Sequence, residues 1–320
     1  MNSRTPAASD LISADRERAG CVDKQSEPGT DKPKTGTRGL RRQLRLQEVE
    51  KRGESRRGTE PLGVKAVKEP NMSAAPTRKY LLTFDFDETI VNENSDDSVI
   101  RAAPSQELPE SVRQTFQEGF YNQYMQRVFE YLGDKGVRMQ DYLEVYEKIP
   151  FSPGMLELFG FLSKNKELFE IILLSDANVF GIESLLRSTG YLSLFRKIFS
   201  NPAYFDNRGY LTLEPYHSHG CSQCPANMCK RKILSEYLTE RSHEGVEFEK
   251  LFYVGDGAND FCPSVVLTST DVAYPRKNYP MHRMIQKMEE AQPGVYQAKV
   301  VPWDSADVIR QCLERQLKQA

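Results

Sequence analysis

The sequence predicts an α/β fold: a Rossmann-like parallel sheet with helices on both faces and a small helical cap inserted after the first strand. Three short apolar runs predict the sheet, at Tyr80–Phe84, Ile171–Leu174 and Leu251–Val254. Uninterrupted apolar runs of this length suit strands that are buried on both faces, as they are in a parallel sheet. Helix-forming stretches lie between or after these runs, and such alternation is typical of the α/β class.

The remaining elements follow from the residues between the strands. Helices are expected at 154–165, 178–189, 227–241, 259–267 and 304–318. A hairpin is expected at 204–213, where Asn207-Arg208-Gly209 separates two short apolar stretches. The interval 96–149 is rich in helix formers and long aromatic side chains and has no strand-like run. It is therefore predicted to be the helical cap, inserted into a core of residues 80–95 and 150–320.

Residues 1–79 differ in composition from the rest of the chain. They contain no Phe, Tyr or Trp, and their 18 Lys and Arg outnumber their 11 Asp and Glu. Only 10 of them are Leu, Ile, Val or Phe, which is too few for a packed core. This composition predicts a disordered basic N-terminal tail. The acidic balance of residues 80–320 argues against nucleic acid as a partner.

Several other classes of protein are disfavoured. No apolar run approaches the roughly 18–20 residues that span a bilayer. The first 30 residues lack the apolar stretch of a secretory signal. Six cysteines in 320 residues do not make a disulfide scaffold. The expectation is a soluble, cytoplasmic protein with no membrane span, and the sequence leaves its oligomeric state open.

Polar side chains gather at the carboxyl ends of the predicted strands, where open α/β sheets bind ligands. In chain order these residues are Asp85, Asp87, Ser175, Asp256 and Asp260, with Lys230 at the start of a later helix. Each is common by itself, and an acid at a strand end often does no more than cap a turn or helix. Their joint occurrence, each at a predicted element end, favours a functional site.

This constellation resembles the haloacid dehalogenase superfamily of phosphohydrolases, over residues 80–320. The first motif of that family often has Gly where this chain has Glu88, a departure that leaves both aspartates in place. Members that cleave carbon–halogen bonds lack an acid at the position of Asp87, because a halide leaving group needs no proton. The resemblance therefore implies an enzyme, a phosphoric monoester hydrolase acting on small molecules.

The same resemblance assigns the acids their roles. Asp85 would be the nucleophile that forms an aspartyl-phosphate, and Asp87 the general acid and base. Mg²⁺ would be the cofactor, because it screens the repulsion between a carboxylate and a phosphate and prefers oxygen ligands. Its ligands would be Asp85, the backbone carbonyl of Asp87, and Asp256. Asp260 would orient these ligands or pair with the lysine.

Ser175 and Lys230 would bind the phosphoryl oxygens and stabilise the charge of the transition state.

Five longer stretches further resemble the branch of the superfamily that hydrolyses phosphocholine and phosphoethanolamine and supplies phosphate for skeletal mineralisation. These stretches are 84–91, 93–97, 175–178, 224–230 and 253–263. That branch implies the lumen of matrix vesicles as a second location, and no preference between the two substrates follows from the sequence.

In that branch, Asp96 and Asp176 would face the amine of the substrate, since a fixed cation two carbons from the ester oxygen favours carboxylates or aromatic faces. The alternatives are an N-terminal helix cap for Asp96 and a turn residue for Asp176. Three aromatic residues of the cap, Phe120, Tyr121 and Tyr124, would either add cation–π contacts or form the core of the cap, and their helical spacing favours the core.

Two other functions stay open. One is hydrolysis of pyridoxal 5′-phosphate within the same superfamily, where a flat ring would favour stacking over two carboxylates. The other is a non-catalytic, zinc-binding interaction protein. Its candidate ligands lie within a short segment and are His217, His219, Cys221, Cys224 and Cys229. The alternative for this segment is a set of reduced cysteines packed beside Lys230.

Overall fold

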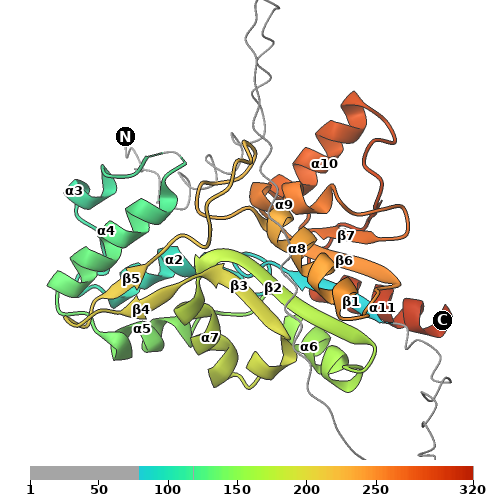
Figure 1. The fold of residues 1–320 in the computed structure, drawn as a ribbon. Helices are drawn as coiled ribbons and strands as arrows, with labels where there is room; N and C mark the ends of the chain where they lie inside the picture. The colour runs from blue at the N-terminus through green and yellow to red at the C-terminus, as the bar shows by residue number, and fades with distance from the viewer. Residues whose placement is uncertain (1–78, 118, 320) are drawn as a thin grey trace, which may run out of the picture. The chain divides into compact units, whose positions relative to one another are not determined.

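The computed structural model describes residues 79–117 and 119–319 (Figure 1). The expected N-terminal tail, residues 1–79, lies outside these ranges except for its last residue. Among the described helices, none is both long and apolar enough to cross a membrane.

A parallel sheet forms the centre of the described region. Its strands are β1 (Tyr80–Phe84), β2 (Phe169–Asn178), β3 (Lys197–Asn201), β6 (Lys250–Gly255), β7 (Val272–Pro275) and β8 (Lys299–Val300). They follow the spatial order β3-β2-β1-β6-β7-β8, and each neighbouring pair is parallel. The predicted fold class is therefore confirmed. The order places the first strand in the middle, so residues that follow β1, β2 and β6 meet at one edge of the sheet.

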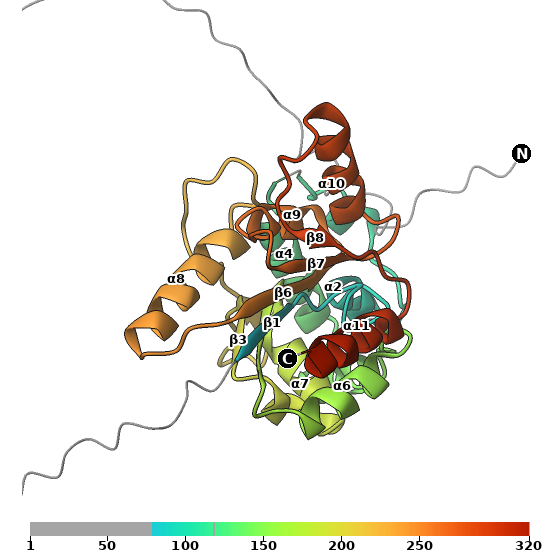
Figure 2. The same ribbon diagram turned by 90° about the vertical axis from the view of Figure 1, so that its right-hand side faces the viewer.

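Helices cover both faces of the sheet because successive side chains of β1 point to opposite faces. Leu82 and Phe84 pack with the apolar side chains of α6 (Met155–Lys164), α7 (Val179–Ser188) and α11 (Ala306–Gln319). Leu81 packs on the other face with α8 (Lys230–His243) and α10 (Pro280–Ala291). Figure 2 shows α8 on one side of the strands and α6, α7 and α11 on the other.

The helices predicted after residue 150 lie within about three residues of their expected bounds. The expectation at 259–267 corresponds to α9 (Ala258–Ser264). Three strands and one helix were not anticipated: β3, β7, β8 and α10. The strand β7 has four residues and β8 has two, and runs this short carry little periodicity.

Short helices fill the interval between β1 and α6. They are α2 (Ser95–Ser98), the 3₁₀ helix η1 (Val99–Ala102), α3 (Glu110–Arg113), α4 (Tyr121–Asp134) and α5 (Met139–Tyr146). The expected hairpin is present as antiparallel β4 (Ala203–Phe205) and β5 (Leu211–Leu213). It packs on α4 so closely that a Cβ on Gly133 would lie 2.5 Å from the Tyr210 ring.

Candidate active site

The loop after β1 is held by its own backbone and by a distant arginine. Asp85 donates its N–H to the Val254 carbonyl at 2.9 Å, and the Phe86 N–H donates to Asp85 Oδ1 at 2.7 Å. Glu88 has a φ of +51°, a left-handed conformation that costs a residue with a Cβ about 1–2 kcal/mol. Arg276 donates to both the carbonyl and the carboxylate of Glu88, which holds this conformation in place of the usual glycine.

Three carboxylates meet where β1 and β6 end. The carboxylate oxygens of Asp85, Asp256 and Asp260 lie within 4.8 Å of one another, and all three residues are buried. Lys230, the first residue of α8, enters this cluster from the side. Its Nζ lies 2.8 Å from Asp85 Oδ1 and 2.7 Å from Asp260 Oδ1. The sheet and α8 thus bring four of the sequence-predicted residues into direct proximity.

The two oxygens of Asp260 are fully used by neighbouring donors. Its Oδ1 accepts from the Tyr253 hydroxyl at 2.8 Å as well as from Lys230, and its Oδ2 accepts from the Gly257 N–H at 2.9 Å. Burial opposes ionisation, but the charge and hydrogen bond of Lys230, together with the hydrogen bonds from the carboxylate's other neighbours, outweigh it and keep the pKa of Asp260 below its ordinary value. Asp260 is therefore the ionised partner of the lysine.

Asp85 is different, because one of its two oxygens lacks a partner. Its Oδ2 is buried and accepts no hydrogen bond from any residue that the structure describes. Burial first, and then the Asp260 carboxylate, raise the pKa of Asp85 well above its ordinary value despite the nearby ammonium. An orphaned carboxylate oxygen beside two further carboxylates fits a hard divalent cation, which takes oxygen ligands. These residues thus fit Mg²⁺.

Asp87 lies close by but outside this group of three. Its Oδ1 accepts from the Ser95 N–H at 2.9 Å, at the start of α2. The sequence analysis assigned the backbone carbonyl of Asp87, and not its side chain, to the metal. That assignment stays a prediction. Asp256 accepts from the Thr89 hydroxyl at 3.1 Å, which ties the loop after β1 to the end of β6.

Ser175 was expected to end the second strand, but β2 runs on to Asn178. Pairing with β1 stops at Leu173, whereas Asn178 still pairs with Asn201 of β3 after a shift in register. The strand is therefore irregular at Ser175 and Asp176. Ser175 is fully buried, and its Oγ accepts from the Ala177 N–H at 3.2 Å.

Asp176 is half-buried, and its Oδ2 accepts from Asn259 Nδ2 at 2.9 Å. This bond joins the end of β2 to α9, the helix that carries Asp260 of the acid cluster. The backbone carbonyl of Asp176 accepts from Asn201 Nδ2. Both amides hold Asp176, and the sequence analysis gave neither a role: Asn259 lies within the matched stretch 253–263, whereas Asn201 lies in no motif.

Asp96 is 2% exposed and lies in the first turn of α2. The cap of this helix is Asn94, whose side chain accepts from the Asp97 N–H, so the alternative role of Asp96 as the N-cap is wrong. Asp96 Oδ1 instead accepts from Asn178 Nδ2 at 2.9 Å. Within the described ranges, no Lys or Arg forms an ion pair with Asp96. Burial, and then the Asp87 carboxylate, raise the pKa of Asp96 well above its ordinary value.

Asn178 links Asp96 to the rest of the molecule, and the sequence analysis did not single it out. Besides Asp96, its Nδ2 donates to the Tyr146 hydroxyl at 2.8 Å, and its Oδ1 accepts from the Gly181 N–H as the cap of α7.

The aromatic residues that the sequence offered for cation–π contacts differ in exposure. The Tyr124 ring is buried against Phe116, as expected for a core residue, whereas 51% of Phe120 is exposed.

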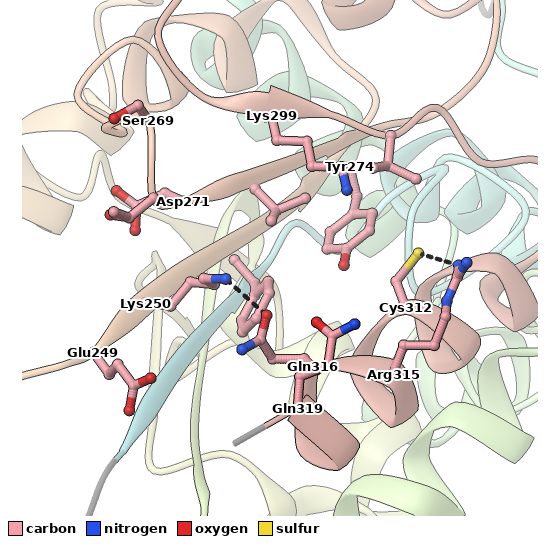
Figure 3. Close-up of a pocket in the computed structure, with 14 residues that line it drawn as sticks. Glu249, Lys250, Ser269, Asp271, Tyr274, Lys299, Cys312, Arg315, Gln316 and Gln319 are labelled. Atoms are coloured by element: carbon pink, nitrogen blue, oxygen red, sulfur yellow. Dashed lines mark hydrogen bonds between the residues drawn. The ribbon is translucent and has the colours of Figure 1, made fainter.

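Two cavities lie apart from the acid cluster. One, of about 670 Å³, opens between α11 and the strands β6 to β8 (Figure 3). Lys250, which begins β6, lines it and donates to Gln316. Asp256 follows the carboxyl end of β6, whereas Lys250 begins the strand, so this cavity reaches the opposite end of the strands from the acid cluster. A second cavity, of about 440 Å³, is bordered by α4 and the segment 213–227, and Asn227 in its wall donates to Asn201.

Comparisons with known proteins agree on one family. The model of a family described as putative phosphatase matches residues 80–317. A phosphoethanolamine/phosphocholine phosphatase from Gallus gallus is 68% identical over 77% of this chain and 92% of its own length. The protein of the same name from Homo sapiens is 60% identical over the same shares. A human pyridoxal phosphate phosphatase is 42% identical over 72% of this chain and 96% of its own length.

Proposed function

Since the chain belongs to the putative phosphatase family and is a phosphomonoesterase, we propose that it hydrolyses phosphocholine and phosphoethanolamine. The products would be inorganic phosphate and choline or ethanolamine. The reaction would depend on Mg²⁺ and pass through an aspartyl-phosphate. Two observations support the proposal: the shared identity with the avian and human enzymes, and a buried carboxylate, Asp96, that no described cation neutralises.

The acid cluster supports the proposed chemistry at the phosphate end. Asp85, Asp256 and the backbone carbonyl of Asp87 would hold Mg²⁺, which when bound offsets the repulsion between the anionic substrate and the carboxylates. Asp85 attacks phosphorus, the bond between phosphorus and the ester oxygen breaks, and Asp87 gives its proton to the departing alkoxide. Water then attacks phosphorus, Asp87 takes its proton, and phosphate leaves while the Asp85 carboxylate is restored.

Lys230 and Ser175 would hold the phosphoryl oxygens during both steps. The ammonium of Lys230 already touches Asp85 at 2.8 Å, so a phosphoryl group on that carboxylate would lie within its reach. Asp260 holds the lysine through the 2.7 Å contact and keeps it charged. Ser175 lies within the neighbouring strand β2, at the point where its pairing becomes irregular.

The amine end is the feature that carries the choice of substrate. A buried carboxylate without a cation is costly unless it is protonated or a ligand brings the charge. Among the described residues, the donor to the Asp96 carboxylate is the Asn178 amide, at 2.9 Å. A quaternary or primary ammonium bound beside it would supply the missing charge. Asp176, half-buried and bonded to Asn259, would contribute a second carboxylate next to the phosphate-binding serine.

The test compares substrates that share a phosphate but differ in the rest. Initial rates with Mg²⁺ are measured on phosphocholine, phosphoethanolamine, pyridoxal 5′-phosphate and p-nitrophenyl phosphate. Asp96→Asn and Asp176→Asn should lower kcat/KM for the two amine substrates by about 10- to 100-fold, the value of a charged contact of about 1–3 kcal/mol. Activity on p-nitrophenyl phosphate should change much less, because the phosphate end is untouched.

Asp97→Asn is the matched control, since it makes the same change one position along α2. It should leave the ratio of kcat/KM between phosphocholine and p-nitrophenyl phosphate unchanged. If that ratio is also unchanged in Asp96→Asn and Asp176→Asn, the proposed amine site is wrong. If the wild type prefers pyridoxal 5′-phosphate, its substrate is instead the one named for the 42% identical human relative.

We extend the proposal, by resemblance alone, to a supply of inorganic phosphate for skeletal mineral. The extension is tested by adding phosphocholine to mineralising cell cultures that express either the wild type or the Asp85→Asn variant. Equal mineral deposition in the two cultures would contradict it.

A further inference from the structure

A second cluster of ligand-type side chains lies beside the active site, and the phosphatase reaction does not use it. The sulfur atoms of Cys221, Cys224, Cys229 and Cys262 all lie within 4.8 Å of one another. Those of Cys221 and Cys262 are 3.8 Å apart. Cys229 and Cys262 are buried, and the other two are partly buried. All four are free cysteines in the structure.

The four cysteines come from two segments of the chain. Three lie in the loop between β5 and α8, and the fourth lies in α9. The sequence alone suggested the three loop cysteines together with His217 and His219. The fourth, Cys262, was missed because it lies far from the other three in the sequence, just after the segment Gly255–Asp260.

The two histidines are outside the sulfur cluster and serve the loop instead. His217 Nε2 accepts from the Cys229 N–H at 3.1 Å. His219 Nδ1 accepts from the Cys221 N–H at 3.2 Å, and its other ring nitrogen contacts the Pro225 carbonyl at 2.8 Å. They thus fix the backbone at two of the cysteines, and the ligand set consists of sulfur alone.

The convergence of the four sulfur atoms fits a tetrahedral metal site. Zinc binds thiolates at about 2.3 Å, which places neighbouring sulfurs of a tetrahedron about 3.8 Å apart. Cysteines that merely fill an apolar core have no reason to converge as a set of four, and disulfides would join them as two separate pairs. Soft thiolates favour zinc over the hard cations that suit the acid cluster.

We propose that Cys221, Cys224, Cys229 and Cys262 bind one zinc ion in a structural tetrathiolate site. Four protein ligands leave no open position for water or substrate, so the ion stabilises the fold and takes no part in the hydrolysis. It fastens the loop before α8 to α9. Cys229 immediately precedes Lys230, and Cys262 follows Asp260 by two residues. The zinc therefore positions both members of the Lys230–Asp260 ion pair.

The first test is the metal content of the full-length chain, purified without a metal-affinity tag and with reductant present. Elemental analysis should find about one zinc per chain. Cys221→Ser and Cys262→Ser, one from each segment, should reduce this content at least several-fold. Cys312→Ser is the matched control, because Cys312 is a free cysteine of α11 outside the cluster, and it should retain the zinc. Asp256→Asn should retain it too, which separates this site from the acid cluster.

A second test uses the wild-type protein and so does not depend on whether a variant folds. Protein produced in cobalt-supplemented medium should show the intense visible absorption of tetrahedral Co²⁺–thiolate, and the band should disappear when zinc is added. Wild-type protein that contains no zinc, shows no such band and exposes the four thiols to a thiol reagent in its folded state would overturn the proposal. Disulfides between these cysteines in freshly purified protein would overturn it equally.

Discussion

Buried charged groups lie at both ends of the strands of the central sheet. Among the described residues, carboxylates outnumber cations at the carboxyl end, and cations outnumber carboxylates at the amino end. At the carboxyl end, two of the three clustered carboxylates, those of Asp85 and Asp260, share the ammonium of Lys230. At the amino end, one buried carboxylate, Glu170 of β2, meets several cations. Arg241 donates to both of its oxygens, at 2.8 and 2.9 Å, and Lys79 lies 3.3 Å away.

One helix supplies the principal cation at each end. Lys230 is the first residue of α8, and Arg241 lies in its last turn, about 16 Å farther along the axis. A positive charge is favourable at the carboxyl end of a helix and unfavourable at the amino end, where the helix dipole is itself positive. Arg241 is thus placed where it stabilises, whereas Lys230 is placed against the dipole, where an anionic ligand needs it.

The comparison separates a structural ion pair from a functional site. Burial disfavours the charge of Glu170, but the hydrogen bonds from Tyr237 and Arg241 outweigh it and lower its pKa. The pKa of Asp85 is raised, and one of its oxygens has no donor among the described residues. A satisfied carboxylate contributes to stability. An unsatisfied one is maintained at a cost, which the proposed binding of substrate and Mg²⁺ would offset.

The largest expected effect is that of Asp85→Asn, which removes the proposed nucleophile at the carboxyl end. Turnover should fall by about 10⁴-fold or more, as it does when a nucleophile is lost. The melting temperature should stay the same or rise, because the variant no longer buries an unneutralised carboxyl group. Steady-state kinetics and thermal unfolding measure the two quantities. Turnover near that of the wild type in a folded variant would contradict the assignment.

A pair of lysine and arginine variants tests the two ends against each other. Lys230→Met removes the ammonium that Asp85 and Asp260 share, and Arg241→Met removes the guanidinium that donates to both oxygens of Glu170. Each should destabilise the protein, by up to about 3–5 kcal/mol. Only Lys230→Met should also lower kcat/KM, by about 10²- to 10³-fold, since it loses a charge that faces the phosphoryl group. Denaturant unfolding and kinetics at a temperature where both variants are folded give the comparison. A similar fall in kcat/KM for Arg241→Met would remove the distinction.

Glu170→Gln tests the amino end alone. It should leave kcat unchanged and lower the free energy of unfolding by about 1–3 kcal/mol, because a charged acceptor becomes neutral. The pKa of Glu170 is lower in the folded state than its ordinary value of 4.5. Its contribution is therefore fully present above pH 4.5 and disappears as the pH falls through the folded-state pKa. Unfolding curves of wild type and variant should converge in acid, and a constant difference down to pH 2 would show that packing causes it.

Two tyrosines give the smallest and most closely matched comparison. Tyr237 donates to Glu170 at 2.6 Å, and Tyr253 donates to Asp260 at 2.8 Å, so each serves a buried carboxylate at its own end of the sheet. Tyr237→Phe and Tyr253→Phe should each cost about 1 kcal/mol of stability. Tyr253→Phe alone should also lower kcat a few-fold, because Asp260 positions the lysine. Equal kcat in the two variants would limit Tyr253 to a structural role.

The sequence predicted the middle of the fold better than its edges. The runs that became β1, β2 and β6 are continuous and apolar because these strands are buried on both faces. The strand β7 and the edge strand β8 are too short to show a period. The irregularity at Ser175 depends on pairing with β3, which lies beyond any local pattern. The residues at strand ends came with motifs and were found. Asn178 and Cys262 lie inside stretches that the sequence analysis matched, 175–178 and 253–263, but their roles, like that of Asn201, depend on partners distant in sequence and were not predicted.

The central position of β1 has a consequence for how the protein is made. Both neighbours of β1 are synthesised after it, the later one ending only at Gly255. At a synthesis rate of about 5–20 residues per second, the nascent chain carries a strand with two unpaired edges for on the order of ten seconds or more. During this time the apolar side chains of Tyr80–Phe84 have no sheet to join, and Asp85 has neither its lysine nor the acids after β6. A product terminated before Asp260 therefore holds every residue of the first motif, lacks the cluster, and exposes a template for aggregation.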